Sequence, residues 1–328
     1  MPDFIETYKE LKPKYTRLES NIYSFLQQAL DENNISIFNI ESRVKDDKSV
    51  QDKIISKGYQ NPLTEIEDFC GVRVICYYQE DISKICDIIK NNFDVIKEDN
   101  KQSELSDNQF GYSSFHYIIK IKEEWLGHPS AKGLKDFKSE VQIRTMLMHT
   151  WSAISHKLLY KKEQDIPSHF KRKLNRLSAL IELADEQFDQ IKNEKIEYNS
   201  SLTTAKHVFD LNAELNSDSL KAIQSYYFKE RNSSDNQIPN LLDEIRSADL
   251  SLYQFVNALH KCLEFFPEME QEEADQHDME LPLWGFAGIV RTVLDICSPK
   301  YFANRKSTLP NDVIEIREKY RAVYESKI

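Results

Sequence analysis

The six residues from Glu140 to Thr145, Glu-Val-Gln-Ile-Arg-Thr, alternate polar and apolar side chains. On a β-strand, successive side chains point to opposite faces. The polar face would carry Glu140, Gln142 and Arg144, while the apolar pair anchors the strand in a core. A carboxylate can hold a metal ion or accept a proton, and a guanidinium suits phosphate oxygens. An ordinary half-exposed strand shows the same alternation, so other segments must support a catalytic interpretation.

A basic segment upstream offers a site for phosphates. Arg43 and Lys45 share a face if their segment is extended, Ser49 would open the next helix, and Lys53 lies one turn further along it. A helix N-terminus adds free N–H groups and the positive end of the helix dipole. The segment therefore indicates a polyphosphate site, although a solvated helix start would read similarly.

Two further segments carry residues that could contact a nucleotide. Asp68 would begin a strand and could hold a divalent cation, Gly71 would allow a close approach, and Arg73 could reach a phosphate. In a second strand, Tyr112, Ser114 and His116 would share one face. A tyrosine ring can stack on a base and a histidine can donate to a phosphate, although both are also common core residues.

The apolar patterns predict a mixed α/β region followed by a helical one. Helices are expected at 3–32 (with a kink or break near Pro13), 49–57 and 80–92, and strands at 35–44, 68–78, 114–122 and around 140. Residues 100–109 and 123–136 are expected to be loops. From Met146 onward the pattern is helical. We place the domain boundary after residue 198, giving domains 1–198 and 199–328.

Composition indicates a soluble, helix-rich protein of two domains, because the chain has 328 residues and only seven glycines and ten prolines. A net charge of −11 argues against broad nucleic-acid binding. No apolar run is long enough for a membrane span, and no leader is visible. Five cysteines without a C-x-x-C pair suggest reduced thiols, so we expect a cytoplasmic protein.

The last 130 residues carry no motif that indicates a function. The acidic run at 268–280 is interpreted as a solvated loop or helix face. The apolar stretches 252–266 and 281–296 are expected to pack on each other. Oligomerisation, ligand sensing and restraint of an active site remain alternative roles for this region.

Five segments in this order resemble the RelA/SpoT-type synthetases, which make the alarmones ppGpp and pppGpp. The segments are Arg43-x-Lys45-x3-Ser49-x3-Lys53, Asp68-x2-Gly71-x-Arg73, Gly111-Tyr112-x-Ser114-x-His116, Glu140-x-Gln142-Ile143-Arg144-Thr145 and Trp151-x4-His156-x3-Tyr160-Lys161. The resemblance spans roughly residues 35–190, and the chain is similar to a small alarmone synthetase with about 130 extra helical residues. It implies a nucleotidyltransferase-like mixed sheet flanked by helices, here followed by an all-α region.

The resemblance also implies a reaction and a role for each residue. The 3′-hydroxyl of GDP or GTP would attack the β-phosphorus of ATP, releasing AMP. Asp68 and Glu140 would hold Mg²⁺, and Glu140 would also activate the hydroxyl. ATP would be bound by Arg43, Lys45, Ser49, Lys53 and Arg73. The acceptor and the phosphates would be bound by Tyr112, His116, Gln142, Arg144, His156 and Lys161.

Two departures from the family pattern lie on the acceptor side, and they leave the acceptor open. Ser113 stands where many synthetases have a basic residue, and Ser155 where many small synthetases have a glutamate. Some small relatives pyrophosphorylate the 3′ end of tRNA, and the basic segment 169–176 could contact an acceptor stem. A non-catalytic nucleotide-binding module is a third alternative, and self-association into a homo-oligomer is also left open.

Overall fold

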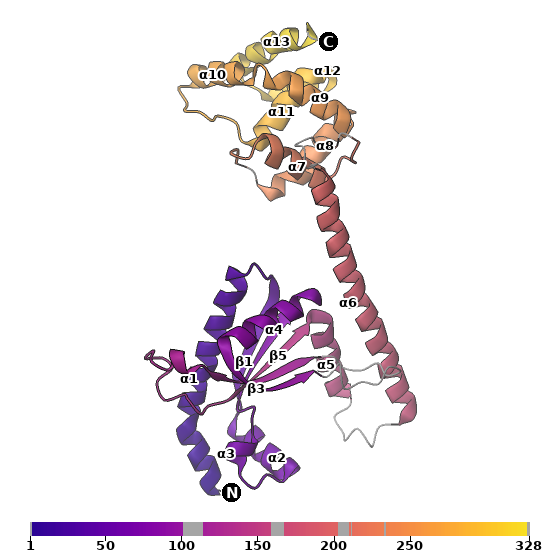
Figure 1. Cartoon of the computed structure of the whole chain (residues 1–328). Helices are drawn as coiled ribbons and strands as arrows, with labels where there is room; N and C mark the ends of the chain where they lie inside the picture. The colour runs from indigo at the N-terminus through magenta and orange to yellow at the C-terminus, as the bar shows by residue number, and fades with distance from the viewer. Residues whose placement is uncertain are drawn as a thin grey trace. The chain divides into compact units, whose positions relative to one another are not determined.

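The chain forms two compact units, residues 1–192 and 193–328, each with its own hydrophobic core (Figure 1). The structure is a computed structural model, and it describes residues 2–100, 114–158, 167–202, 210, 212–232 and 234–326. The domain boundary after residue 198 stays a prediction. Among the described helices, none is long and apolar enough to cross a lipid bilayer.

The first unit is built on a mixed five-stranded sheet of order β1-β2-β5-β4-β3. β2 and β5 pair in parallel, and the other three pairs are antiparallel. The strands are β1 (Ile37–Val44), β2 (Cys70–Cys76), β3 (Phe93–Asn100), β4 (Phe115–Ile121) and β5 (Ser139–Thr145). The helices are α1 (Pro2–Glu32), α2 (Asp47–Lys57), α3 (Pro62–Glu65), α4 (Glu80–Asn92), α5 (Met146–Leu158) and α6 (Ser168–Leu202), with a 3₁₀ turn at Glu123–Trp125. The predicted fold class, a mixed sheet flanked by helices and followed by a helical region, is confirmed.

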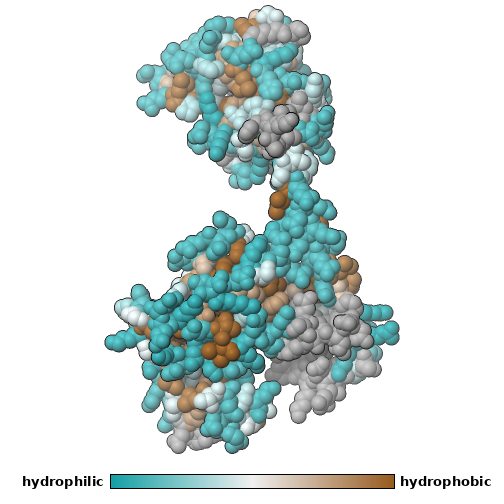
Figure 2. Space-filling view, viewed as in Figure 1, coloured by the Kyte–Doolittle hydropathy of each residue, from teal (hydrophilic) through white to brown (hydrophobic). Residues whose placement is uncertain are grey.

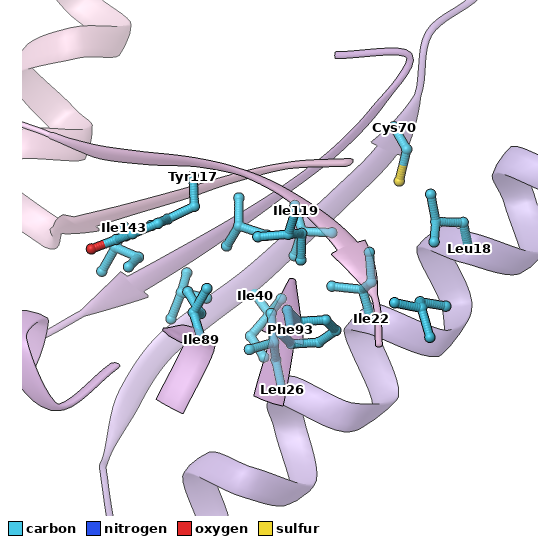
Figure 3. Close-up of a cluster of buried hydrophobic side chains, with 14 of the residues drawn as sticks. Leu18, Ile22, Leu26, Ile40, Cys70, Ile89, Phe93, Tyr117, Ile119 and Ile143 are labelled. Carbon is cyan, nitrogen blue, oxygen red and sulfur yellow. The ribbon is translucent and has the colours of Figure 1, made fainter. Parts of the chain in front are cut away.

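α1 and α4 cover one face of this sheet and form the core with it. Figure 3 shows Leu18, Ile22 and Leu26 of α1 turned toward the strands, with Ile89 of α4 in the same cluster. Every second residue of β2 and β5 points into this core, which is why Val141 is fully buried. The apolar half of the alternation at 140–145 therefore anchors the strand, as predicted.

Three details of the first unit differ from the sequence-based expectation. α1 is one continuous helix through Pro13, so no break occurs there. α2 begins at Asp47 with Asp46 as its N-cap, because the Asp46 carboxylate accepts the Ser49 N–H at 2.8 Å. β2 begins at Cys70, so Asp68 precedes the strand by two residues.

The described residues of the second unit form the end of α6 and further helices joined by loops, with no strand among them. Its helices are α7 (Ser217–Tyr227), α8 (Ile238–Ser247), α9 (Leu252–Leu263), α10 (Phe266–His277), α11 (Phe286–Cys297), α12 (Pro299–Arg305) and α13 (Asn311–Glu325), with 3₁₀ turns at Asp235–Gln237 and Lys306–Thr308. α9 and α11 contact each other in a common core, so the predicted packing of their apolar stretches is confirmed. In Figure 2 the visible surface is mostly hydrophilic, with separate small hydrophobic patches.

The interpretation of the acidic run as solvated is wrong for Glu270 and Glu273, which are buried in the second unit. Arg231 donates to both carboxylate oxygens of Glu270, at 2.6 and 2.7 Å. Arg317 donates to Glu273 at 2.8 Å. These buried carboxylates are held by arginines far away in the sequence, so the run is partly a structural element of the core.

Candidate active site

The second face of the sheet carries a row of polar side chains that crosses all five strands. The residues that pair in register are Glu41, Arg73, Gln142, His116 and Asp99. Adjacent members interact: Arg73 donates to Glu41 at 2.7 Å and to the Gln142 amide oxygen at 3.3 Å. Arg144 also donates to that oxygen. The predicted polar face at 140–145 is thus part of a hydrogen-bonded network.

Asp68 is held by two lysines at the end of this face. Its Oδ2 lies 2.5 Å from the Lys45 Nζ and 2.7 Å from the Lys53 Nζ. Burial alone would raise the pKa of Asp68, but the hydrogen bonds and charges of the two lysines outweigh it and lower the pKa. The Oδ1 atom is buried and has no hydrogen-bond partner among the described residues. Asp68 is therefore an anion with one buried oxygen that is unpaired within the described part of the chain.

Glu140 is held by hydrogen bonds from two neighbouring side chains instead. His116 Nδ1 lies 2.8 Å from Glu140 Oε1, and the Gln142 amide donates to Oε2 at 2.9 Å. Burial would raise the pKa of Glu140, but the hydrogen bonds from His116 and Gln142 lower it overall. Both carboxylates are thus ionised at neutral pH.

A cavity of about 270 Å³ lies over the strands β1 and β2. Its lining includes Arg43, Lys45, Arg73, Asp68 and Glu140. Gly71 forms part of its wall between Arg43 and Glu140 in the strand register, and a Cβ at Gly71 would meet no atom within 4 Å. A side chain at this position would therefore project into the cavity. Three cations around a small polar cavity can bind several phosphate oxygens.

A second cavity of about 130 Å³ shares Asp68 and Glu140 with the first one. Its other lining residues include Lys53, Tyr59, Lys97, Asp99 and His116. The two carboxylates therefore stand between two polar cavities, where a ligand in one would face a ligand in the other.

The structure brings together most residues that the sequence singled out. Arg43, Lys45, Lys53, Asp68, Arg73, His116, Glu140 and Gln142 line these two cavities. Ser49 is placed differently, because its hydroxyl donates to the cap residue Asp46 at 2.7 Å. Arg144 is buried beneath Gln142. His156 belongs to α5, while Tyr112 and Lys161 lie outside the described residues.

Sequence reasoning missed several residues of the two cavities. Glu41 lies two residues before Arg43 on the same strand, so the period of two could have found it. Lys97 and Asp99 lie on β3, which was not predicted. Tyr59 follows the Gly58 cap of α2, and its position next to the lysines carried no signal in the sequence.

Comparisons with known proteins show the family to which this chain belongs. Residues 42–165 match the family described as the region found in RelA / SpoT proteins. The chain is 30% identical over 158 residues to the GTP pyrophosphokinase YwaC of Bacillus subtilis (strain 168), a match that covers 47% of this chain and 73% of YwaC. It is 29% identical over 170 residues to the GTP pyrophosphokinase YjbM of the same strain, covering 51% of this chain and 77% of YjbM. The chain therefore belongs to the RelA/SpoT family of (p)ppGpp synthetases.

Solved structures of small synthetases are similar over the same region. Small alarmone synthetase 1 from Bacillus subtilis has 26% identity and a TM-score of 0.49, and the match covers 58% of this chain and 99% of that chain. Small alarmone synthetase 2 from the same organism has 27% identity and a TM-score of 0.48, with 57% and 98% covered.

Proposed function

We propose that this protein transfers pyrophosphate from ATP to the 3′-hydroxyl of GDP or GTP and so makes (p)ppGpp. The observation that supports the proposal most directly is the position of Asp68 and Glu140 between two polar cavities. A transfer between two nucleotides needs two sites that meet at the reacting phosphorus. Positioning and neutralisation of charge supply most of the catalysis in such reactions.

The donor ATP would occupy the larger cavity. Its cations Arg43, Lys45 and Arg73 can neutralise phosphate charge, and guanidinium groups bind phosphate oxygens in pairs. Lys53 lines the smaller cavity, but its Nζ lies 2.7 Å from Asp68 Oδ2, and from there it would reach the donor phosphates. In this arrangement the lysines leave Asp68 when the phosphates enter, because each ammonium group would gain a more highly charged partner.

The residues present fit a bound Mg²⁺. Asp68 and Glu140 are ionised oxygen donors, and Asp68 Oδ1 is buried without a hydrogen-bond partner among the described residues. Mg²⁺ is often bound by one or two carboxylates together with substrate phosphates. Bound there, the ion would neutralise charge on the transferred phosphates.

The acceptor nucleotide would occupy the side of the smaller cavity. The oxygen of the 3′-hydroxyl would form a bond to the β-phosphorus of ATP, and Glu140 would accept the proton that this hydroxyl loses. The bond between the α- and β-phosphates would break, and AMP would leave. Tyr112 would stack on the base of the acceptor, while His116 and Gln142 orient Glu140. His156 and Lys161 are assigned to the acceptor side by family resemblance alone.

The test incubates the purified full-length chain with γ-labelled ATP, Mg²⁺ and one acceptor at a time: GDP, GTP or bulk tRNA. We expect the label in ppGpp or pppGpp, identified by chromatography against standards, together with equimolar AMP. If the label stays attached to tRNA and no labelled guanosine nucleotide is found, the acceptor is tRNA and not GDP or GTP. No transfer to any acceptor would contradict the proposal.

A charge reversal on α6 separates the two acceptors further. Lys171, Arg172 and Lys173 lie in the first turns of this helix. A free nucleotide needs no extended basic surface, so changing all three to glutamate should leave alarmone synthesis nearly unchanged. If tRNA were the acceptor, the same change should abolish labelling, and the wild-type activity should fall steeply with salt.

A further inference from the structure

Ser114, His116 and Glu140 form a chain of hydrogen bonds on the polar face of the sheet. Ser114 Oγ lies 2.6 Å from His116 Nε2, and His116 Nδ1 lies 2.8 Å from Glu140 Oε1. Ser114 directly precedes β4, and its side chain is completely buried. The family resemblance assigned no role to this serine, and the assigned functions do not use it.

The carboxylate of Glu140 requires a hydrogen-bond donor on the His116 nitrogen that faces it. An ionised carboxylate only accepts hydrogen bonds, so the Nδ1 atom must carry a proton. A neutral imidazole carries one N–H, and its other nitrogen then has a free lone pair. In this tautomer Nε2 is the acceptor, and it faces the Ser114 hydroxyl.

The burial of Ser114 favours the same arrangement from the other end. Among the residues that the structure describes, the Ser114 hydroxyl is hydrogen-bonded to His116 Nε2 alone. If the hydroxyl accepted a proton from Nε2, its own hydrogen would be buried without that partner. A buried donor left unsatisfied costs about 1–3 kcal/mol. The hydroxyl therefore donates to Nε2, and the ring keeps its proton on Nδ1.

We propose that Ser114 is a positioning residue that fixes the tautomer of His116 and thereby keeps Glu140 correctly oriented for the acceptor hydroxyl. The inference rests on the proposed function of Glu140 as the base, while its structural part concerns His116 alone. Gln142 fixes the second oxygen of the same carboxylate at 2.9 Å. His116 and Gln142 each hold one oxygen of Glu140. Without Ser114, only the Gln142 member of this pair would keep a fixed orientation.

Removal of the hydroxyl should release the ring. In Ser114→Ala the Nε2–H tautomer becomes accessible, and in that form the Nδ1 lone pair faces Glu140. The carboxylate then loses the hydrogen bond from His116, and its orientation is less well fixed. We expect kcat to fall about 10- to 100-fold, as is usual for residues that orient a reactive group.

The tautomer is measured directly by long-range ¹H–¹⁵N correlation spectroscopy of the full chain with ¹⁵N-labelled histidine. The His116→Gln variant, which lacks one set of signals, assigns the residue. We expect the wild type to carry its proton on Nδ1 and Ser114→Ala to show a mixture of tautomers. Ser114→Thr, which retains the hydroxyl, should restore the Nδ1–H form and most of the activity.

Ser139→Ala is the matched control. Ser139 is also completely buried and lies on a neighbouring strand, but its hydroxyl bonds to Cys70 within the core. This variant should leave the tautomer of His116 and kcat unchanged. A wild-type ring with its proton on Nε2, or a Ser114→Ala protein with an unchanged tautomer, would overturn the inference. If the wild type transferred no pyrophosphate, the proposed function would fail, while the spectrum would still decide the role of Ser114.

Discussion

The two carboxylates between the cavities are stabilised by different chemistry. Asp68 is paired with the ammonium groups of Lys45 and Lys53, whereas Glu140 is held by hydrogen bonds from His116 and Gln142. A flexible lysine can turn to an incoming phosphate, whereas His116 and Gln142 are held by further hydrogen bonds on the sheet. In the proposed reaction Asp68 would therefore change partners when the donor binds, and Glu140 would keep its orientation.

Removal of either negative charge should abolish transfer and leave the fold intact. We expect Asp68→Asn and Glu140→Gln each to lose at least ~100-fold in kcat, because both charges act where the transferred group and the cation meet. Asp94→Asn, an exposed change on β3, is the control. Rates are measured with labelled ATP, and circular dichroism reports the fold. Near-normal rates in either variant would refute the assignment.

Lys53 should contribute to the donor site more than to the acceptor site. In Lys53→Gln we expect ATP affinity to fall about tenfold, the usual effect of losing one hydrogen bond to a charged group. GDP affinity should stay within about twofold. Calorimetry with a non-hydrolysable ATP analogue measures the first, and Lys57→Gln, an exposed lysine one turn later, is the control. An equal loss for both nucleotides would rule out the assignment of Lys53 to ATP.

Among the helices, α6 contacts the catalytic sheet through buried polar residues. Thr145 at the end of β5 donates to Asp185 at 2.7 Å, and Asp189 accepts the backbone N–H groups of Gln79 and Glu80 at the start of α4. The carboxylate of Asp189 thus caps a helix that lacks a side-chain cap of its own. α6 therefore ties together the end of β5 and the beginning of α4.

Asp185 should make this attachment sensitive to pH. Burial raises the pKa of Asp185 from 3.8 to about 6. Between these values the unfolded chain is ionised while the folded chain holds the proton, so stability falls as pH rises from about 4 to about 6. Asp185→Asn removes this loss. Its stability relative to the wild type should increase over that range by on the order of 2 kcal/mol and then stay constant.

The measurement is urea unfolding of wild type and Asp185→Asn at several pH values. Trp125 and Trp151 report on the first unit when Trp284 is replaced by Phe. Asp94→Asn again serves as the exposed control. A stability difference that does not change between pH 4 and pH 6 would show that Asp185 ionises normally in the folded protein.

The sequence predicted elements with regular periodicity and missed those in which the period is broken. β5 was predicted because its alternation is complete, and the same alternation identified Glu140 and Gln142. β3 was missed because a register shift between Val95 and Lys97 interrupts the period, which leaves Ile96 exposed. Lys97 and Asp99, which lie on this strand, were therefore not identified as residues of the site.

Long-range pairing explains the other limits of sequence reasoning at the site. Asp68 and Glu140 were both singled out, but their different partners could not be inferred, because Lys45 and Asp68 are 23 residues apart. Glu270 was misjudged for the same reason, since its partner Arg231 is 39 residues away. Tyr112 and Lys161 stay predictions.

Over the whole molecule, each unit has a core of its own, so the two should unfold as separate transitions. Leu18 and Leu259 are both almost completely buried, the first in the core of the sheet and the second in the helical unit. Leu18→Ala and Leu259→Ala should each destabilise one transition by about 2–5 kcal/mol and leave the other unchanged. Calorimetry of the full chain tests this, and each variant is the control of the other. A shift of both transitions by either variant would indicate cooperative unfolding of the units.

The order of the strands also has a consequence for the newly made protein. Among the described strands β5 comes last in the sequence, yet it lies in the middle of the sheet between β2 and β4. As the chain leaves the ribosome, β1 with β2 and β3 with β4 appear first as two separate pairs. The strand that joins them also brings Glu140, so sheet and site are completed in the same step. A chain released before residue 139 would lack both β5 and Glu140. We therefore expect it to make no alarmone, even if its N-terminal helices have already formed.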